Sequence, residues 1–201
     1  MRVLMRVLMI VGWLFVGLGG AIFHFGPGQK HLEIDEVNLV LNQARACVAN
    51  QQWSQAINRF DEVLADLPTE KVTESRSVIL EKAKCQMMAA RLPDARETLV
   101  SLLDEIREDE TTDKSFVADV QSALANSQYY TTWLMRLEGM PEEEWKPEIE
   151  AARQHYTQLA NNAEESGDQE LLKRSAEDLE SSIRLARMDL SELQGLPLPS
   201  Q

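Results

Sequence analysis

Hydrophobic residues follow two different patterns along the chain. From Val7 to Phe25 nearly every position is apolar, whereas from Asp35 onward apolar residues recur every three or four positions among polar ones. A continuous apolar run predicts a helix surrounded by lipid, and the three-to-four spacing predicts amphipathic helices with one buried face. No segment after Asp35 alternates apolar and polar residues for long, so the sequence predicts an all-α domain.

The first apolar run has the features of a membrane anchor. Residues 7–25 would form a helix of roughly 28 Å, close to the hydrocarbon thickness of a bilayer. Arg2 and Arg6 precede the run, and only Lys30 and the largely neutral His31 follow it. The positive-inside rule then predicts a single-pass protein of the inner (cytoplasmic) membrane, with its N-terminus in the cytoplasm and its helical domain outside. A cleaved signal peptide and a buried core helix are the alternative interpretations.

Two helical hairpins are predicted after the anchor. The apolar positions of the first are Val37, Val40, Leu41, Ala44 and Val48, followed by Trp53, Ala56, Ile57, Phe60, Val63 and Leu64. Those of the second are Val78, Leu80, Ala83 and Met87, followed by Ala95, Leu99, Leu102, Leu103 and Ile106. Gln51-Gln52 separates the helices of the first pair and the turn Ala90-Arg91-Leu92-Pro93-Asp94 those of the second, so each pair is expected to fold back on itself.

The two hairpins resemble tetratricopeptide repeats, in which small and large apolar residues take fixed places on a helix pair. The matching residues are Ala44, Trp53, Ala56, Phe60 and Pro68 in the first hairpin, and Ala83, Leu92, Ala95, Leu99 and Leu102 in the second. The resemblance implies an antiparallel hairpin solenoid with a concave protein-binding surface. Gln43 and Lys82 depart from it, since they replace the usual leucine. A bundle of unrelated helices is the alternative.

The remaining sequence predicts a long helix at Phe116–Leu137 and a degenerate third hairpin. Its two helices would end at about Glu165 and about Leu193, with Tyr156, Leu159, Ala160, Leu172, Ala176 and Leu179 facing inward. The predicted organisation is therefore an anchor, a linker, two hairpins, the long helix with the third hairpin, and a Pro-rich tail, at residues 1–28, 29–35, 36–110, 115–193 and 194–201.

Charge and composition narrow the functional classes. The chain carries 33 acidic and 20 basic side chains, a net charge of −13, which argues against nucleic-acid binding. Its three histidines have no partner at ligand spacing, and the sequence has no phosphate loop or nucleophile motif. We therefore expect no catalytic residue, cofactor or metal site. Cys47 and Cys85 are expected to be buried thiols, with a disulfide as the alternative outside the cytoplasm.

Alignment of the two hairpins predicts a binding groove. It pairs Leu41 with Leu80, Arg45 with Lys84, and Val48 with Met87, on the helices that line the groove in the resembled family. Two cations beside an apolar strip favour an extended ligand with acidic and apolar residues. The alternative is that both cations only extend over apolar surface to reach water.

A second candidate patch contains Tyr129, Tyr130 and Trp133, which are either core residues or an exposed partner site. The functional hypothesis is a membrane-anchored scaffold that holds partner proteins in a bacterial envelope complex. The alternative hypothesis is a periplasmic chaperone or assembly factor that binds extended segments of exported proteins.

Overall fold

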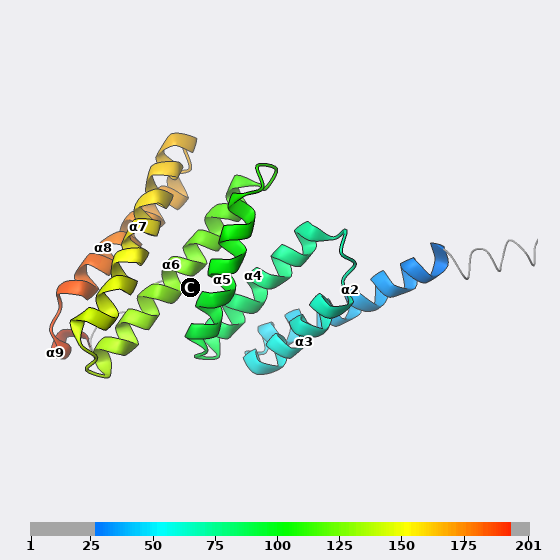
Figure 1. Cartoon of the computed structure of the whole chain (residues 1–201), viewed down its shortest axis with the longest axis horizontal. Coiled ribbons are helices and arrows are strands. Elements are labelled where there is room, and N and C mark those ends of the chain that lie inside the picture. Colours follow the sequence, from blue (N-terminus) through cyan, green and yellow to red (C-terminus); the bar gives the residue numbers. More distant parts are fainter. Residues whose placement is uncertain (1–26, 194–201) are drawn as a thin grey trace, which may run out of the picture. The chain divides into compact units, whose positions relative to one another are not determined.

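The computed structural model describes residues 27–193, including the side chains from residue 34 onward except that of residue 190. All regular structure in this range is helical (Figure 1), which confirms the predicted all-α class. The chain divides into two compact units, residues 1–75 and 76–201, and the boundary falls inside one helix.

The predicted anchor at residues 7–25 and the tail at residues 194–201 lie outside the described residues. Between residues 27 and 193 no helix combines the length and the apolar character that crossing a bilayer requires. Residues 29–35, predicted to be a linker, are helical instead, because helix α2 begins at Pro27. Proline is compatible with a first helical turn, where its missing N–H would have had no partner.

The first unit contains the first predicted hairpin. Helix α2 (Pro27–Ala49) packs against α3 (Trp53–Asp66), and the unit ends with the first residues of α4 (Val72–Met88). The residues buried on the two hairpin helices are Val37, Ala44, Ala56, Ile57, Phe60 and Val63. This set follows the predicted helical spacing, with alanines where the helices approach closely.

The second unit continues α4 and adds α5 (Leu92–Arg107), α6 (Lys114–Leu137), α7 (Glu142–Ser166), α8 (Gln169–Arg187) and the short α9 (Leu190–Leu193). Helices α5 to α8 each pack against the next in the chain, and α4 shares a core with α5 and α6. Figure 1 shows these helices side by side in chain order. The unit is therefore a solenoid-like stack of consecutive helices.

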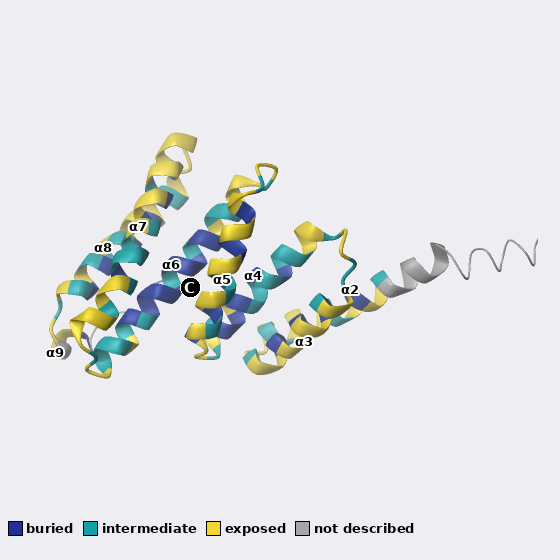
Figure 2. Ribbon diagram, in the orientation of Figure 1, coloured by how far each residue is buried: buried dark blue, intermediate teal, exposed yellow. Residues whose placement is uncertain are grey.

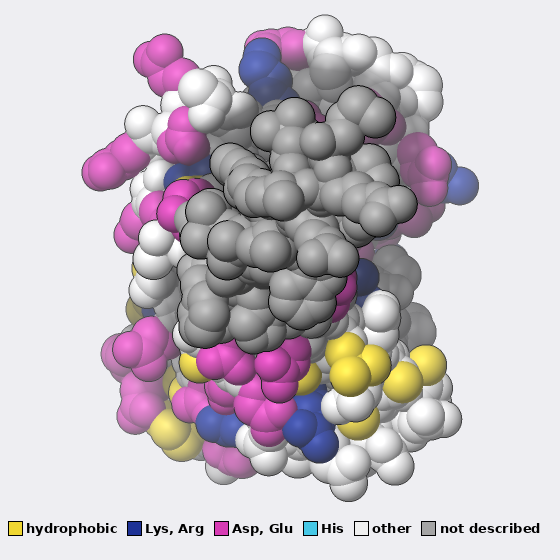
Figure 3. Space-filling model, turned by 90° about the vertical axis from the view of Figure 1, so that its right-hand side faces the viewer, with side chains coloured by type: hydrophobic (Ala, Val, Ile, Leu, Met, Phe, Trp, Pro, Cys, Tyr) yellow, Lys and Arg dark blue, Asp and Glu magenta, His cyan; other side chains and the backbone are white. Residues whose placement is uncertain are grey.

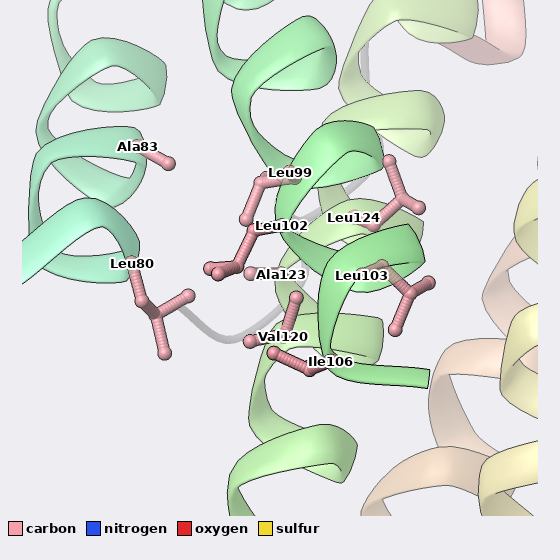
Figure 4. Close-up of a cluster of buried hydrophobic side chains, with 9 residues drawn as sticks. All are labelled: Leu80, Ala83, Leu99, Leu102, Leu103, Ile106, Val120, Ala123 and Leu124. Atoms are coloured by element: carbon pink, nitrogen blue, oxygen red, sulfur yellow. The ribbon is translucent and has the colours of Figure 1, made fainter. Parts of the chain in front are cut away.

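The core of this stack centres on α6. Figure 4 shows Leu80 and Ala83 of α4 in one cluster with residues of α5 and α6, namely Leu99, Leu102, Leu103, Ile106, Val120, Ala123 and Leu124. Figure 2 shows α6 buried along much of its length. A helix that is covered on several sides has to be largely apolar or internally hydrogen-bonded. In α6, the hydroxyls of Ser127 and Thr132 accordingly donate to carbonyls of their own helix.

Four turns between consecutive helices share one backbone motif. Each contains a residue with positive φ: Gln51 (58°), Ala90 (58°), Gly139 (72°) and Gly167 (76°). In every turn this residue's N–H donates to the carbonyl three positions back, and the next residue's N–H donates to the carbonyl five positions back. This is the Schellman motif, which supplies donors to the last carbonyls of a helix. The four turns thus share one backbone geometry.

Two predictions about the C-terminal region were wrong in detail. The last helix does not continue to Leu193, because Met188 is extended and the Asp189 carboxylate caps α9 by accepting from the N–H groups of Ser191 and Glu192. In addition, Ala176 is exposed. The buried face of α8 is instead made of Ser175, Asp178, Ser182 and Leu185. One position along a helix rotates the side chain by about 100°, so the predicted face was displaced toward the apolar residues.

Candidate protein-binding face

The shared turn motif provides a common numbering for the first helix of each hairpin. Counted back from the positive-φ residue, positions −10, −6 and −3 are Leu41, Arg45 and Val48 in α2, and Leu80, Lys84 and Met87 in α4. These are the six residues of the predicted groove. We call these three positions of each helix its turn-register face. Helices α2 and α4 end in the same motif. A given position, such as −6, therefore has the same orientation relative to the turn in both hairpins.

The copy in the first unit presents a cation beside apolar side chains. Arg45 is exposed, and Leu41 and Val48 are half-buried. Ala44, directly before Arg45, is fully buried at position −7, and Ala83 is fully buried at the same position of α4. In both helices position −7 is therefore a buried alanine, and the neighbouring cation is exposed.

On α4, fewer residues of the turn-register face are accessible than predicted. Lys84 is exposed and Met87 is half-buried, but Leu80 is only 6% exposed and belongs to the core cluster of α4, α5 and α6. The prediction that Leu80 lines an open groove was therefore wrong. Met87 also packs against a second cluster that includes residues of α6, α7 and α8. The accessible part of this face is Lys84, the edge of Met87 and the neighbouring exposed Met88.

Helix α6 carries a third copy of the turn-register face, and this copy contains the predicted aromatic patch. Positions −10, −6 and −3 before Gly139 are Tyr129, Trp133 and Arg136, so the predicted aromatic patch is the α6 equivalent of the groove. Tyr129 and Tyr130 are 2% and 9% exposed, and their rings meet edge to face with centroids 5.8 Å apart. Trp133 is half-buried. The structure therefore agrees with the core interpretation for the two tyrosines.

Sequence reasoning missed the third copy because its close-packed alanines lie farther from the turn. Ala125 and Ala152 are both fully buried in one cluster, whereas Thr132 occupies position −7 of α6. The glycine at position 139 was the available signal, since glycine is the commonest residue in the positive-φ position of a Schellman turn.

Arg136, the last residue of the α6 face, uses its guanidinium for structural contacts, so this group is not available to a partner. Its guanidinium lies 4.7 Å from the centroid of the Trp145 ring and donates to the backbone carbonyls of Leu185 and Met188 at the end of α8. Burial lowers the pKa of Arg136, but an arginine stays charged over the physiological range. The cation thus binds the C-terminal end of α8, and α8 is held beside α6.

A second, half-buried cation joins α4 to α5 and to the segment that follows it. Arg76 donates to Glu105 at 2.9 Å, Asp109 at 2.6 Å and Thr112 at 3.2 Å. Hydrogen bonds from Thr111 and Arg76 lower the pKa of Asp109, and those to Asp109 and Glu105 raise the pKa of Arg76. Its acceptors lie on α5 and on the segment between α5 and α6, so Arg76 acts as a structural connector.

Acidic side chains outnumber basic ones in this protein, 33 to 20. Asp and Glu are the more prominent charged side chains on the face shown in Figure 3. Many exposed basic residues are paired within one helix, such as Arg59 with Glu62 at 2.6 Å and Lys146 with Glu142 at 2.6 Å. Such exposed pairs contribute little to stability.

The described side chains give no support to thiol or metal chemistry. Cys47 and Cys85 are both free, and burial, followed by the charge of Glu81, raises the pKa of Cys85 to about 11, so its thiol stays protonated. Burial and nearby Arg107 lower the pKa of His155, whose Nδ1 lies 3.3 Å from the Gln121 amide nitrogen. Among the described residues, no group of three or more His, Cys, Asp or Glu could hold a metal ion.

An open pocket of about 400 Å³ lies on the outer side of α8 and α9. Its lining contains both charges and two apolar side chains: Glu180, Ile183, Arg184, Arg187, Met188 and Glu192. Arg184 is already bound to Glu180 at 2.8 Å. This balanced lining does not select a particular ligand, so the turn-register faces of α2 and α4 are the better candidates for recognition.

Comparisons of the chain with protein-family models, curated proteins and solved structures found no match.

Proposed function

We propose that this protein is a membrane-anchored, non-catalytic scaffold whose helical hairpins bind partner proteins. The observation that supports the proposal most directly is the repetition of the turn-register face. Two hairpins with the same turn geometry each place an exposed cation, Arg45 or Lys84, beside the half-buried apolar residue Val48 or Met87. Stacked helical hairpins usually function in recognition because they offer extended surfaces.

The chemistry of the face favours an extended partner segment with acidic and apolar residues. The protein has a net charge of −13, so an acidic partner would be repelled by most of its surface. Arg45 and Lys84 are exposed basic residues at equivalent positions of their own hairpins, and charge complementarity would direct an acidic segment to each of these faces. The apolar edges of Val48, Met87 and Met88 would contribute contact area that salt does not screen.

The anchor completes the proposal. Residues 7–25 would hold the chain in the inner membrane, with the N-terminus in the cytoplasm and the helical domain outside. The likeness of the hairpins to tetratricopeptide repeats supports a binding function through the residues already named. The test of the anchor is the mass of the mature protein in the membrane fraction, which should include residues 1–28. A soluble product lacking them would contradict the anchor.

The binding face is tested by reversing its charges. The full-length protein would be purified from membranes together with its partners as wild type and as Arg45→Glu/Lys84→Glu. The matched control is Arg59→Glu/Lys173→Glu, which changes the net charge equally at exposed residues elsewhere. The proposal predicts at least a tenfold loss of the stoichiometric partner at low salt in the first variant and retention in the control.

Two outcomes would contradict parts of the proposal. If the first variant keeps its helical circular dichroism and also its partner at low salt, the turn-register face is not the binding site. If wild type yields a broad set of unfolded exported proteins in place of a stoichiometric partner, the chaperone hypothesis replaces the scaffold.

A further inference from the structure

Within the second unit, the buried face of helix α8 is mainly polar. Its buried positions are Ser175, Asp178, Ser182 and Leu185, which recur at helical spacing. Three of these four side chains are polar, and one is a carboxylate. A buried carboxylate is normally paired with a cation or with several hydrogen-bond donors, because an ionised group away from water is costly.

Asp178 lacks such partners. It is 7% exposed, and no described residue forms a hydrogen bond or an ion pair with its carboxylate. Two neighbouring hydroxyls donate elsewhere: that of Tyr156 to Asn126 Oδ1 at 2.7 Å, and that of Ser182 to the carbonyl of Leu179 at 2.7 Å.

The groups that influence Asp178 come from all three packed helices. From α6 the interacting group is Tyr129, and from α7 it is Tyr156; the charge of Asp178 raises the pKa of both phenols, after burial. On α8 itself, Arg174 lowers the pKa of Asp178 and Glu177 raises it. The only cation among these groups is Arg174, which is exposed one turn away and forms no direct contact with the carboxylate.

The ends of α8 are held independently of Asp178. The Gly167 turn and the Asp168 cap, which accepts from the Leu171 N–H at 3.0 Å, fix its beginning. Arg136 binds the carbonyls of Leu185 and Met188 at its end. A change of charge at Asp178 therefore acts on the middle of a helix whose ends have other attachments.

We propose that α8 is a proton-dependent cap: protonation of Asp178 tightens its packing on α6 and α7, and ionisation loosens it. A neutral carboxyl removes the buried charge and gains an O–H donor. Burial raises the pKa of Asp178 from 3.8 to about 6, so the group changes charge over the mildly acidic range. Loosening would make the buried α6 and α7 residues that α8 covers, including Tyr129 and Tyr156, more accessible.

Hydrogen exchange of the full-length protein tests this cap. With pKa values of 3.8 in the opened state and about 6 in the packed state, the opening equilibrium of α8 should rise about tenfold from pH 5 to pH 7.5, after correction for intrinsic exchange rates. Asp178→Asn should abolish this rise because the amide does not titrate. The matched control Glu177→Gln, at the adjacent exposed carboxylate, should retain it.

Three outcomes would overturn the proposal. One is equal protection of α8 at both pH values in the wild type. Another is a tenfold pH effect that persists in Asp178→Asn, which would assign the effect to another group. The third is a pH effect of the same size and the same opening equilibrium in α5, which would show that the whole unit unfolds and that α8 does not open separately. Circular dichroism of each variant establishes that the helices are formed.

Discussion

Helices α5 and α8 belong to the same unit and have similar lengths, yet α5 buries only apolar side chains and α8 buries mainly polar ones. Helix α5 buries only apolar residues: Leu92, Ala95, Leu99, Leu102, Leu103 and Ile106. Helix α8 buries Ser175, Asp178, Ser182 and Leu185. An apolar side chain such as leucine contributes roughly 1.5–3 kcal/mol on burial, whereas a buried polar group contributes little and costs free energy when it lacks a partner.

The two helices are therefore packed against their neighbours by different interactions. The packing of α5 depends on apolar area, which does not titrate and which few local changes can release. The packing of α8 depends on a few apolar side chains, namely Leu179, Leu185 and Ala186, on Arg136 at its end and on the charge of Asp178. We infer that α5 is a permanent part of the core and that α8 is a conditional cap.

The largest expected effect distinguishes the two buried faces directly. Leu102→Ala should lower the free energy of unfolding by about 2–5 kcal/mol, because it leaves a cavity in the cluster of Figure 4. Ser182→Ala should change it by less than about 1 kcal/mol, since that hydroxyl bonds only to its own helix. Urea denaturation measures both values, and equal losses would remove the proposed difference between α5 and α8.

The next effect concerns pH. The pKa of Asp178 in the folded protein is about 6, above its unfolded value of 3.8, so its contribution to stability becomes less favourable as pH rises from about 4 to about 6. Asp178→Asn should therefore stabilise the protein by about 2–3 kcal/mol at pH 7.5 and by progressively less toward pH 3. A variant that is destabilised at pH 7.5 would show that the ionised carboxylate makes a favourable contact. The measurement is urea denaturation across this pH range.

The smallest effect concerns the turns that precede the two helices. Ala90, before α5, has positive φ at a cost that glycine avoids, so Ala90→Gly should stabilise the protein by about 0.5–1 kcal/mol. Gly167→Ala, before α8, should destabilise it by about 1 kcal/mol. No atom lies within 4 Å of the added Cβ, so the cost comes from the backbone alone. Thermal denaturation should show melting temperatures that shift in opposite directions, and shifts of the same sign would contradict this explanation.

The same comparison shows what the sequence could predict. The α5 face was predicted correctly because its leucines, with Ala95 and Ile106, recur at helical spacing, and apolar spacing is the strongest signal of a buried face. The α8 face was missed because its buried residues are polar. Leu172, Ala176 and Leu179 drew the predicted face away from Ser175 and Asp178, and no apolar pattern can reveal a buried carboxylate.

The candidate binding face, too, was predicted in part from the sequence. The sequence placed Arg45 and Lys84 at equivalent positions because the alanines of their hairpins align, and the turns at Gln51 and Ala90 give both hairpins the same geometry. The burial of Leu80 depends on α6, which is distant from α4 in the sequence but shares a core cluster with it in the folded protein. Sequence spacing describes one helix at a time, so it could not show that this position is covered.

The most direct test of the difference between α5 and α8 is native-state hydrogen exchange at pH 7.5 and increasing low concentrations of urea. This measurement gives an opening free energy for the amides of each helix. The account predicts that α8 exchanges through a separate opening with a free energy at least about 2 kcal/mol below that of α5, whose amides exchange only through global unfolding. Equal opening free energies and equal urea dependence in the two helices would contradict it.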